Sequence, residues 1–477
     1  MGWRRPRTLL DELYIMTRVN KLLPALAVIL AACGLVAEPA TTSSSATNTV
    51  APVATTTTLA EQRLEVQNCG APPVTFSALC EVYELIQEWH VDRPIADDVL
   101  ADAALDALRN HTPAATEEKP RTLFCAIPSE SFVDFCEELA SMVWEAEIAV
   151  GPAVDEAVVA MTDLGLDPFT YYVPPEQVGS FRQNGVVGGV GVLLDATNSV
   201  GSKCARIDET CPLEIVFVLE NNPGAEAGLM AGDQILSVDG ETVNGKGFAA
   251  TATSIAGDES GLVTISVDRD GQTLDFEIRR SLISVPTVDV SLPQANVGYL
   301  RIPDFEADIG RLVEDALESL TEASPATIVV DLRDNPGGFV DSVLDVADQF
   351  LSGGTIVATS GPDENFEYPA SSGGLATSER LIVLVNRGTA SAAEILAGAL
   401  RDQRSAVVVG TNTFGKDAVQ IPFVLRNGGE LYVAVARWST PSGATAGNGG
   451  LTPDRELELP VDVSVEDLVQ AALDAAS

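Results

Sequence analysis

The segment TIVVDLRDNPGG, residues 327–338, decides the fold class of the C-terminal part of the chain. Residues 327–331 are a β-branched run of strand length, which predicts a strand buried in a parallel sheet. The run leads into Gly337 and Gly338. Adjacent glycines let backbone N–H groups face a cavity, as an oxyanion hole requires. An ordinary turn between a strand and a helix is the alternative interpretation of the same residues.

Strands and helices alternate on both sides of this segment, which is typical of an α/β core. The predicted strands cover residues 297–302, 327–331, 381–385 and 406–409, and the predicted helices cover 308–321, 341–351 and 392–401. We therefore expect an α/β domain over residues 284–459. A final helix is expected within residues 460–477, because Ser464 followed three residues later by Asp467 resembles a capping box.

Residues 185–283 differ from the core, with short β-branched runs separated by glycines. Within them, GLMAGDQILSVDG (residues 228–240) places glycines at a helix end and a tight turn, then a strand and an Asp-Gly hairpin turn. A second hairpin turn is expected at Asp270-Gly271. The segment resembles a PDZ domain, a β-sandwich or barrel-like module embedded in the chain. An unrelated small β-module is the alternative.

The resemblance to PDZ domains implies a peptide-binding turn. In such domains a Gly-rich turn before the second strand binds the terminal carboxylate of a peptide through backbone N–H groups, and the peptide adds a strand to the sheet edge. By position this turn consists of Gly188, Gly189, Val190 and Gly191. Local capture is needed here, because an acidic protein repels a carboxylate over longer distances.

Ser391 lies where a predicted strand meets a predicted helix. The helix dipole there favours developing negative charge, although a serine at such a position is usually only a cap. Lys416 follows twenty-five residues later, and Gln420 four residues after that. Residues 410–416 also match the spacing of a phosphate loop, but the next residue is Asp417 instead of a magnesium-binding Ser or Thr. We therefore exclude nucleotide binding.

Several motifs resemble, in their order along the chain, the carboxy-terminal processing proteases, also called tail-specific proteases. The resemblance covers about residues 80–460 and includes the PDZ-like segment. The matching motifs are LDP (166–168), DLRDNPGG (331–338), SAAE (391–394), GK (415–416) and GLTPD (450–454). The resemblance implies that Ser391 is the nucleophile, Lys416 the general base and Gln420 the residue that orients the lysine. The implied oxyanion hole consists of the amides of Gly337, Gly338 and Ala392.

The chain also departs from the family pattern. Asp417 and Ala418 stand where the family usually has glycine or serine, and Ala393 stands where it has a second serine. A carboxylate at Asp417 would raise the pKa of Lys416 if its side chain pointed inward. Asp402, eleven residues after the serine, matches an acidic position whose supporting role stays open.

The scarcity of histidine agrees with a lysine base. His90 and His111 are the two histidines of the chain, and both lie in the predicted helical segment without a partner motif. A Ser-His-Asp triad therefore lacks its histidine. A buried lysine is a substitute, because desolvation lowers its pKa toward neutrality and leaves a free amine that takes the serine proton.

The N-terminal part predicts export. A run of about ten apolar residues ends in LAAC (30–33); it is too short to span a bilayer and typical of a signal peptide. Small residues before Cys33 resemble a bacterial lipobox, so we expect residues 1–33 to be a lipoprotein signal peptide, with Met16 as the true start. An ordinary signal peptide cut elsewhere is the alternative.

Length and charge constrain the rest of the chain. At about 150 residues per domain, 477 residues correspond to roughly three domains. The Thr/Ser/Ala-rich composition of residues 34–62 predicts a linker. Residues 63–184 are expected to form a helical region with a Cys-bounded insertion. The formal net charge of -41, from 28 basic and 69 acidic residues, excludes nucleic acid as a partner, because phosphate binding needs a basic surface.

Six further cysteines form three close pairs in the sequence: Cys69 with Cys80, Cys125 with Cys136, and Cys204 with Cys211. An even number in an exported chain favours disulfides, and we expect these local pairings. A zinc site is the alternative, but neither a Cys-x-x-Cys spacing nor a neighbouring histidine supports it. We expect neither a metal nor a cofactor.

Together these features predict a lipid-anchored, extracytoplasmic serine endopeptidase on the outer face of a bacterial cytoplasmic membrane. The PDZ-like segment would bind the C-terminal tails of proteins, and the core would cut upstream of them. The alternative is a non-catalytic, PDZ-bearing adaptor on a protease fold, against which the intact Ser391, Lys416 and Gln420 speak.

Overall fold

The computed structural model describes residues 74–96, 99–100, 102–104, 150–163, 166–175, 177–178, 188–200, 202–219, 221–257, 261–283, 288–447, 449–458 and 463–477. The predicted signal peptide with Cys33, the linker and the Cys-bounded insertion lie outside the described residues. The same holds for Cys69, Cys125, Cys136, His111 and the side chain of Cys80. Within the described ranges, no helix has the length and apolar character needed to cross a bilayer.

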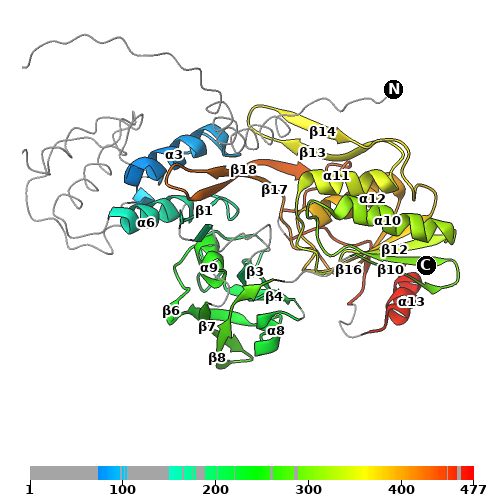
Figure 1. Cartoon of the computed structure of the whole chain (residues 1–477), viewed down its shortest axis with the longest axis horizontal. Coiled ribbons are helices and arrows are strands. Elements are labelled where there is room, and N and C mark those ends of the chain that lie inside the picture. Colours follow the sequence, from blue (N-terminus) through cyan, green and yellow to red (C-terminus); the bar gives the residue numbers. More distant parts are fainter. Residues whose placement is uncertain are drawn as a thin grey trace, which may run out of the picture. The chain divides into compact units, whose positions relative to one another are not determined.

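The chain has the predicted mixed α/β architecture (Figure 1). Its core contains a six-stranded sheet in the order β10-β11-β12-β15-β16-β19. These strands are β10 (Asp289–Gln294), β11 (Val297–Arg301), β12 (Thr327–Asp331), β15 (Arg380–Val385), β16 (Val407–Gly410) and β19 (Arg455–Glu456). The strands from β11 to β19 run parallel, and β10 pairs antiparallel with β11. Parallel strands place their carboxyl ends at one edge, where open α/β sheets hold their sites.

Helices cover both faces of this sheet. They are α10 (Ile309–Glu322), α11 (Val340–Phe350), α12 (Ala392–Arg404) and α13 (Val465–Ala475). The first three pack side by side, and Figure 1 shows α13 on the other side of the sheet. There α13 buries Leu468 and Val469 against side chains of the central strands. The Asp467 amide donates to the Ser464 hydroxyl (3.1 Å), which confirms the predicted start of the last helix.

The PDZ-like segment forms a second sheet with its own core. Its strands are β3 (Val192–Ala196), β4 (Leu213–Val218), β5 (Gln234–Val238), β6 (Glu241–Thr242), β7 (Leu262–Arg269) and β8 (Gln272–Arg279). The short strands β2 (Gly188–Gly189) and β9 (Ser281–Leu282) pair with each other, and the helices are α8 (Pro223–Ala227) and α9 (Phe248–Ile255). Asp270 and Gly271 both have positive φ, which confirms the predicted hairpin turn; α9 was not predicted.

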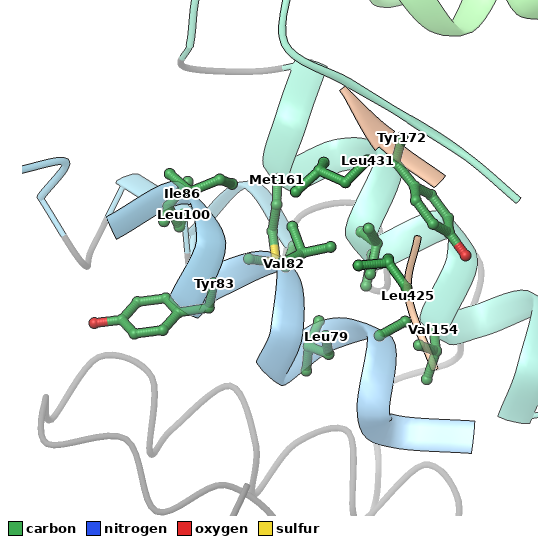
Figure 2. Packing of buried hydrophobic residues seen from close by; sticks show 14 of the residues in the cluster. Leu79, Val82, Tyr83, Ile86, Leu100, Val154, Met161, Tyr172, Leu425 and Leu431 are labelled. Carbon is green, nitrogen blue, oxygen red and sulfur yellow. The ribbon is translucent and has the colours of Figure 1, made fainter. Parts of the chain in front are cut away.

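A third sheet joins the N-terminal helices to the core. It has the order β1-β18-β13-β14, with β17 also paired to β18. Its strands are β1 (Tyr171–Val173), β13 (Thr355–Ser360), β14 (Asn365–Pro369), β17 (Ala418–Val424) and β18 (Glu430–Ser439). The N-terminal helices are α3 (Val74–Trp89) and α6 (Val150–Asp163). Figure 2 shows Val82 and Ile86 of α3 and Met161 of α6 packed with Leu431 of β18. Each such side chain contributes about 1.5–3 kcal/mol on burial, so this cluster anchors the β17–β18 hairpin that carries Gln420.

Candidate active site

Ser391 occupies a sharp turn between β15 and α12. The strand ends at Val385, on the carboxyl edge of the parallel sheet, and the helix begins at Ala392. Ser391 has a φ of 52°, in the left-handed region, where a residue with a side chain costs about 1–3 kcal/mol. A strained strand-to-helix turn of this kind presents a nucleophilic side chain at the edge of a sheet.

The glycine loop after β12 lies directly against this turn. A Cβ atom on Gly337 would come within 2.8 Å of the Ser391 Cβ atom and 3.0 Å of the Ala392 nitrogen, so only glycine fits here. Asn335 holds the loop: its Oδ1 accepts from the Gly337 amide (2.8 Å), and its carbonyl accepts from the Ala390 amide (2.9 Å). The fold thus brings Gly337 and Ala392 next to Ser391.

The three predicted oxyanion donors differ in their hydrogen bonding. The Gly337 amide is already engaged by the Asn335 side chain. The amides of Gly338 and Ala392 have no acceptor among the described residues. Ala392 is the first residue of α12, where backbone amides lack partners within the helix. The geometry therefore leaves the Ala392 amide, next to Ser391, as a donor for a developing negative charge, and leaves the Gly338 amide unengaged.

Glu394 links the predicted nucleophile to the predicted base. It is fully buried in the first turn of α12, at 0% exposure. Its Oε2 accepts from the amides of Ser391 (2.8 Å) and Lys416 (3.0 Å), and its Oε1 accepts from the Gly415 amide (2.8 Å) and the Thr413 hydroxyl. Burial raises the pKa of Glu394 to about 7, although these hydrogen bonds lower it. The sequence motif contained this residue but gave it no role.

The amine of Lys416 lies in surroundings that favour its neutral form. Burial lowers the pKa of Lys416 to about 8, although the carboxylates of Asp167 and Glu394 raise it. Its Nζ lies 5.6 Å from the centre of the Phe169 ring and forms no ion pair within the described part of the chain. A lysine with this pKa is partly a free amine near neutral pH, which is the form that accepts a proton.

Gln420 approaches Lys416 indirectly. Its Nε2 donates to the backbone carbonyl of Phe169, whose ring faces the lysine. Among the described residues no hydrogen bond joins the two side chains, although both line the same cavity. In this structure Gln420 therefore orients the residue beneath the lysine rather than the lysine itself.

His90 has a partner that the sequence analysis missed. Its Nε2 lies 2.7 Å from Asp167 Oδ2, in the LDP motif, and the Thr170 hydroxyl donates to the same oxygen (2.7 Å). Burial raises the pKa of Asp167, but the hydrogen bonds from His90 and Thr170 outweigh this effect and hold the pKa below its usual value. The sequence analysis found no partner motif for His90, and the structure supplies a partner in Asp167 of the LDP motif. Its partner lies 77 residues away in the sequence, beyond any local signal.

Asp417 and Asp402 both interact away from the lysine amine. Asp417 Oδ1 lies 3.4 Å from Arg437 Nη1, and its charge is absent from the causes that shift the pKa of Lys416. Asp402 Oδ2 accepts from the Ser442 amide (2.8 Å) and thus holds a turn after β18. Neither carboxylate touches Ser391 or Lys416 among the described residues.

A cavity of about 680 Å³ is lined by residues of both predicted sites. Its catalytic side includes Gly337, Lys416 and Gln420. Its PDZ side includes the turn Gly188–Gly191 and residues of α9. The predicted carboxylate-binding turn and the predicted base therefore line the same cavity.

The PDZ-like segment also contacts the core beside a loop that is closed by a disulfide. Cys204 and Cys211 are bonded, as predicted, and the other two pairings stay predictions. Beside this loop, Lys203 Nζ lies 3.6 Å from the centre of the ring of Phe414, two residues before Lys416. Within the described residues, no group of three or more His, Cys, Asp or Glu side chains is arranged to hold a metal ion.

Comparison with known families gives two matches. Residues 296–457 match the model of peptidase family S41, and residues 195–279 match the model of the PDZ domain.

Known proteins are similar to the chain over most of its length. The carboxy-terminal-processing protease of Bartonella bacilliformis is 33% identical over 318 residues, which cover 65% of this chain and 70% of that protein. The carboxyl-terminal-processing protease of Synechocystis sp. is 35% identical over 317 residues, which cover 65% and 71%. The structure of a photosystem II D1 C-terminal processing protease matches with a TM-score of 0.60 at 23% identity, covering 85% of this chain and 98% of that one, and shows the shared fold.

Proposed function

The chain belongs to the carboxyl-terminal-processing proteases of peptidase family S41 and carries a PDZ domain, and from this premise we propose that it cleaves proteins near their free C-termini through a Ser/Lys acyl-enzyme mechanism. Ser391 is the nucleophile and Lys416 the general base. Support for these roles comes from the strained backbone of Ser391, the lowered pKa of Lys416 and the Glu394 carboxylate that joins their backbones.

The reaction proceeds in two stages. The free amine of Lys416 removes the proton of the Ser391 hydroxyl while Oγ attacks the scissile carbonyl carbon. The amides of Ala392 and Gly338 stabilise the resulting oxyanion. As the C–N bond breaks, the lysine returns the proton to the leaving amine and an acyl-enzyme remains. Water, deprotonated by the same lysine, then hydrolyses this ester and regenerates the serine.

The shared cavity is the observation that carries the proposal. The amides of Val190 and Gly191 have no acceptor within the described residues, and successive amides of a glycine-rich turn bind an anion. The side chains of Leu193, Phe217 and Phe248 give the PDZ side of the cavity an apolar lining. A tail bound by its carboxylate at this turn has its preceding residues in the same space as Lys416.

Amidation of the substrate C-terminus tests this recognition. Hydrogen bonds to a charged group contribute about 1.5–3 kcal/mol, so a peptide with an apolar tail and a free carboxylate is expected to have a kcat/KM at least tenfold above that of its amidated twin. The scissile bond is identical in the two peptides, so the ratio isolates recognition from chemistry. Equal values of kcat/KM would show that the PDZ domain does not select free termini.

The pH dependence of cleavage tests the lysine base. The active form is the free amine, and the pKa of Lys416 is about 8. For an amidated short peptide, kcat/KM is therefore expected to rise about tenfold per pH unit below pH 7 and to level off above pH 8. Asp167→Asn removes a charge that raises this pKa, so the midpoint should move to lower pH. Asp417→Asn is the matched control and should leave the midpoint in place; equal shifts in both variants would contradict the assignment.

The proposal extends to the location of the enzyme. We propose that the protein is exported and anchored by lipid at Cys33 on the outer face of the cytoplasmic membrane, with the stretch 34–62 as a linker. The lipobox-like LAAC sequence supports the anchor. The Cys204–Cys211 disulfide supports an oxidising compartment, because cytosolic thiols are kept reduced.

A further inference from the structure

Helix α9 lines the PDZ side of the cavity, here called the groove, and it begins without a side-chain cap of its own. Its N-cap residue is Gly247, which has no side chain to accept from the first amides of the helix. The carboxylate of Asp163, the last residue of α6, takes this place and accepts a hydrogen bond from the Ala250 backbone. Asp163 is 7% exposed. A cap on the first turn of a helix contributes about 0.5–2 kcal/mol.

Gly247 is required by this contact rather than by its backbone conformation. Its φ of -70° suits any residue. A Cβ atom there would lie 1.9 Å from Asp163 Oδ2 and 2.2 Å from Asp163 Cγ, so the carboxylate lies directly against the glycine. Gly247 and Asp163 thus form one contact, called the joint below, between the N-terminal helices and the PDZ domain.

The other end of α9 is held from within the PDZ domain. Arg280 donates from Nε to the Ile255 carbonyl (3.0 Å) and from Nη2 to the Ser254 carbonyl (2.7 Å). Just beyond the helix, the Gly257 amide donates to the carbonyl of Gly188, in the carboxylate-binding turn (3.1 Å). A shift of α9 therefore moves both the wall and the anion-binding end of the groove.

The first turn of α9 is part of the cavity wall. Phe248 and Ala249, which directly precede Ala250 in this turn, line the cavity together with Ala252 in the next turn. A frayed first turn would displace these side chains. The cap supplied by Asp163 thus acts on the surface that a bound tail contacts.

We propose that Asp163 is a positioning residue for tail binding. Its carboxyl group, supplied from α6 outside the PDZ domain, caps α9 and fixes the groove wall. The protonation state of this group sets how firmly α9 is held. The inference rests on the proposed function for the identity of the bound tail. The contact itself stands on the close approach of the Asp163 carboxylate to Gly247.

The direction of the pH effect follows from burial. Burial raises the pKa of Asp163 to about 7, while the Ala250 hydrogen bond and the charge of Arg206 lower it. Arg206 is the charged group that faces the carboxylate; α9 carries none, and Lys246 pairs with Glu241. The docked carboxyl therefore binds a proton more readily than a free one. Docking is strongest at low pH and weakens as the pH rises through 7; the protonated group still accepts from Ala250 through its carbonyl oxygen.

The test uses the full chain with Ser391→Ala, so that no peptide is cut. Asp163→Ala removes the acceptor, Gly247→Ala displaces it, and Asp163→Asn mimics the neutral acid. Asp155→Asn is the matched control, because Asp155 lies on the same helix but accepts from the Tyr172 hydroxyl (2.7 Å), outside the PDZ domain. Two quantities are measured at pH 6 and pH 8: amide hydrogen exchange over residues 248–256, and the Kd of a labelled apolar peptide with a free carboxylate.

Asp163→Ala and Gly247→Ala are each expected to speed exchange of α9 at least tenfold and to raise Kd at least threefold at pH 6. The double variant should be no worse than either single one, because both act on one contact. Asp163→Asn and Asp155→Asn should match the parent at pH 6, and Asp163→Asn alone should remove the rise in Kd between pH 6 and pH 8.

Two results would overturn the inference. Parent-like exchange of α9 in both Asp163→Ala and Gly247→Ala would show that the contact does not hold the helix. An Asp163→Asn variant that behaves like Asp163→Ala would show that the neutral form does not cap it. A parent protein that binds no tail would contradict the proposed function instead, and the exchange measurement would still decide on the joint.

Discussion

Replacing Ser391 by alanine is expected to lower the rate of peptide cleavage at least a thousandfold, and replacing Lys416 by alanine is expected to do the same. The two residues act as one unit, so losing either member removes nearly all of the catalysis that the pair provides. The double variant should therefore be hardly slower than each single one. The measurement is kcat/KM on a peptide that the parent cuts, at pH 8, where about half of the lysine is a free amine.

Two further measurements distinguish a loss of catalysis from a loss of folding. Both variants should keep the far-UV circular dichroism and the thermal midpoint of the parent within a few degrees. A covalent probe that reacts with activated serines should label the parent at Ser391 and should fail to label Lys416→Ala. Turnover retained in both variants would remove the Ser/Lys assignment, and a parent that neither cuts nor reacts would favour the adaptor interpretation.

Glu394→Ala is expected to lower kcat at least a hundredfold and also to destabilise the fold. The substitution leaves four buried donors, three amides and the Thr413 hydroxyl, without their acceptor. Each unsatisfied buried group costs about 1–3 kcal/mol. The turn at Ser391 and the loop at Lys416 then lose the side chain that joins them, so the nucleophile and base lose their mutual position. The measurement is kcat at saturating substrate, together with the free energy of unfolding in urea.

A buried carboxylate remote from the site provides the control. Asp233 of the PDZ domain is 1% exposed and binds Arg269 through both oxygens. Asp233→Asn should therefore also lower the free energy of unfolding, while kcat on an amidated peptide stays near the parent value. If both variants lose kcat in proportion to stability, Glu394 has no positioning role beyond the fold.

Local signals in the sequence predicted the parts of the fold that depend on neighbouring residues. The strand at Thr327–Asp331 and the hairpin at Asp270-Gly271 appear where the sequence placed them, because backbone propensity and turn geometry decide them. Ser464 caps the last helix for the same reason. The motifs around Ser391 and Lys416 predicted the candidate site, and in the structure the backbone amides of both residues donate to Glu394.

Contacts between distant residues were beyond such signals. Gln420 reaches the carbonyl of Phe169 over 251 positions, and β1 pairs with β18 over a similar range. The same reason hides Asp163, whose partner Gly247 reads in the sequence as an ordinary loop glycine. Sequence patterns indicate which residues have the right chemistry, while the pairing of buried carboxylates with remote amides depends on tertiary packing.

The left-handed backbone of Ser391 serves catalysis at the expense of thermal stability. A residue with a side chain at this φ stores about 1–3 kcal/mol, which a glycine would release. Alanine would release none of it, since its Cβ meets the same steric conflict. Mutagenesis libraries ranked by melting temperature would therefore enrich Ser391→Gly, a variant that has lost its nucleophile. Selection for robustness alone would drive this chain toward an inert binder of protein tails, so engineering of the enzyme needs turnover as a second criterion at every round.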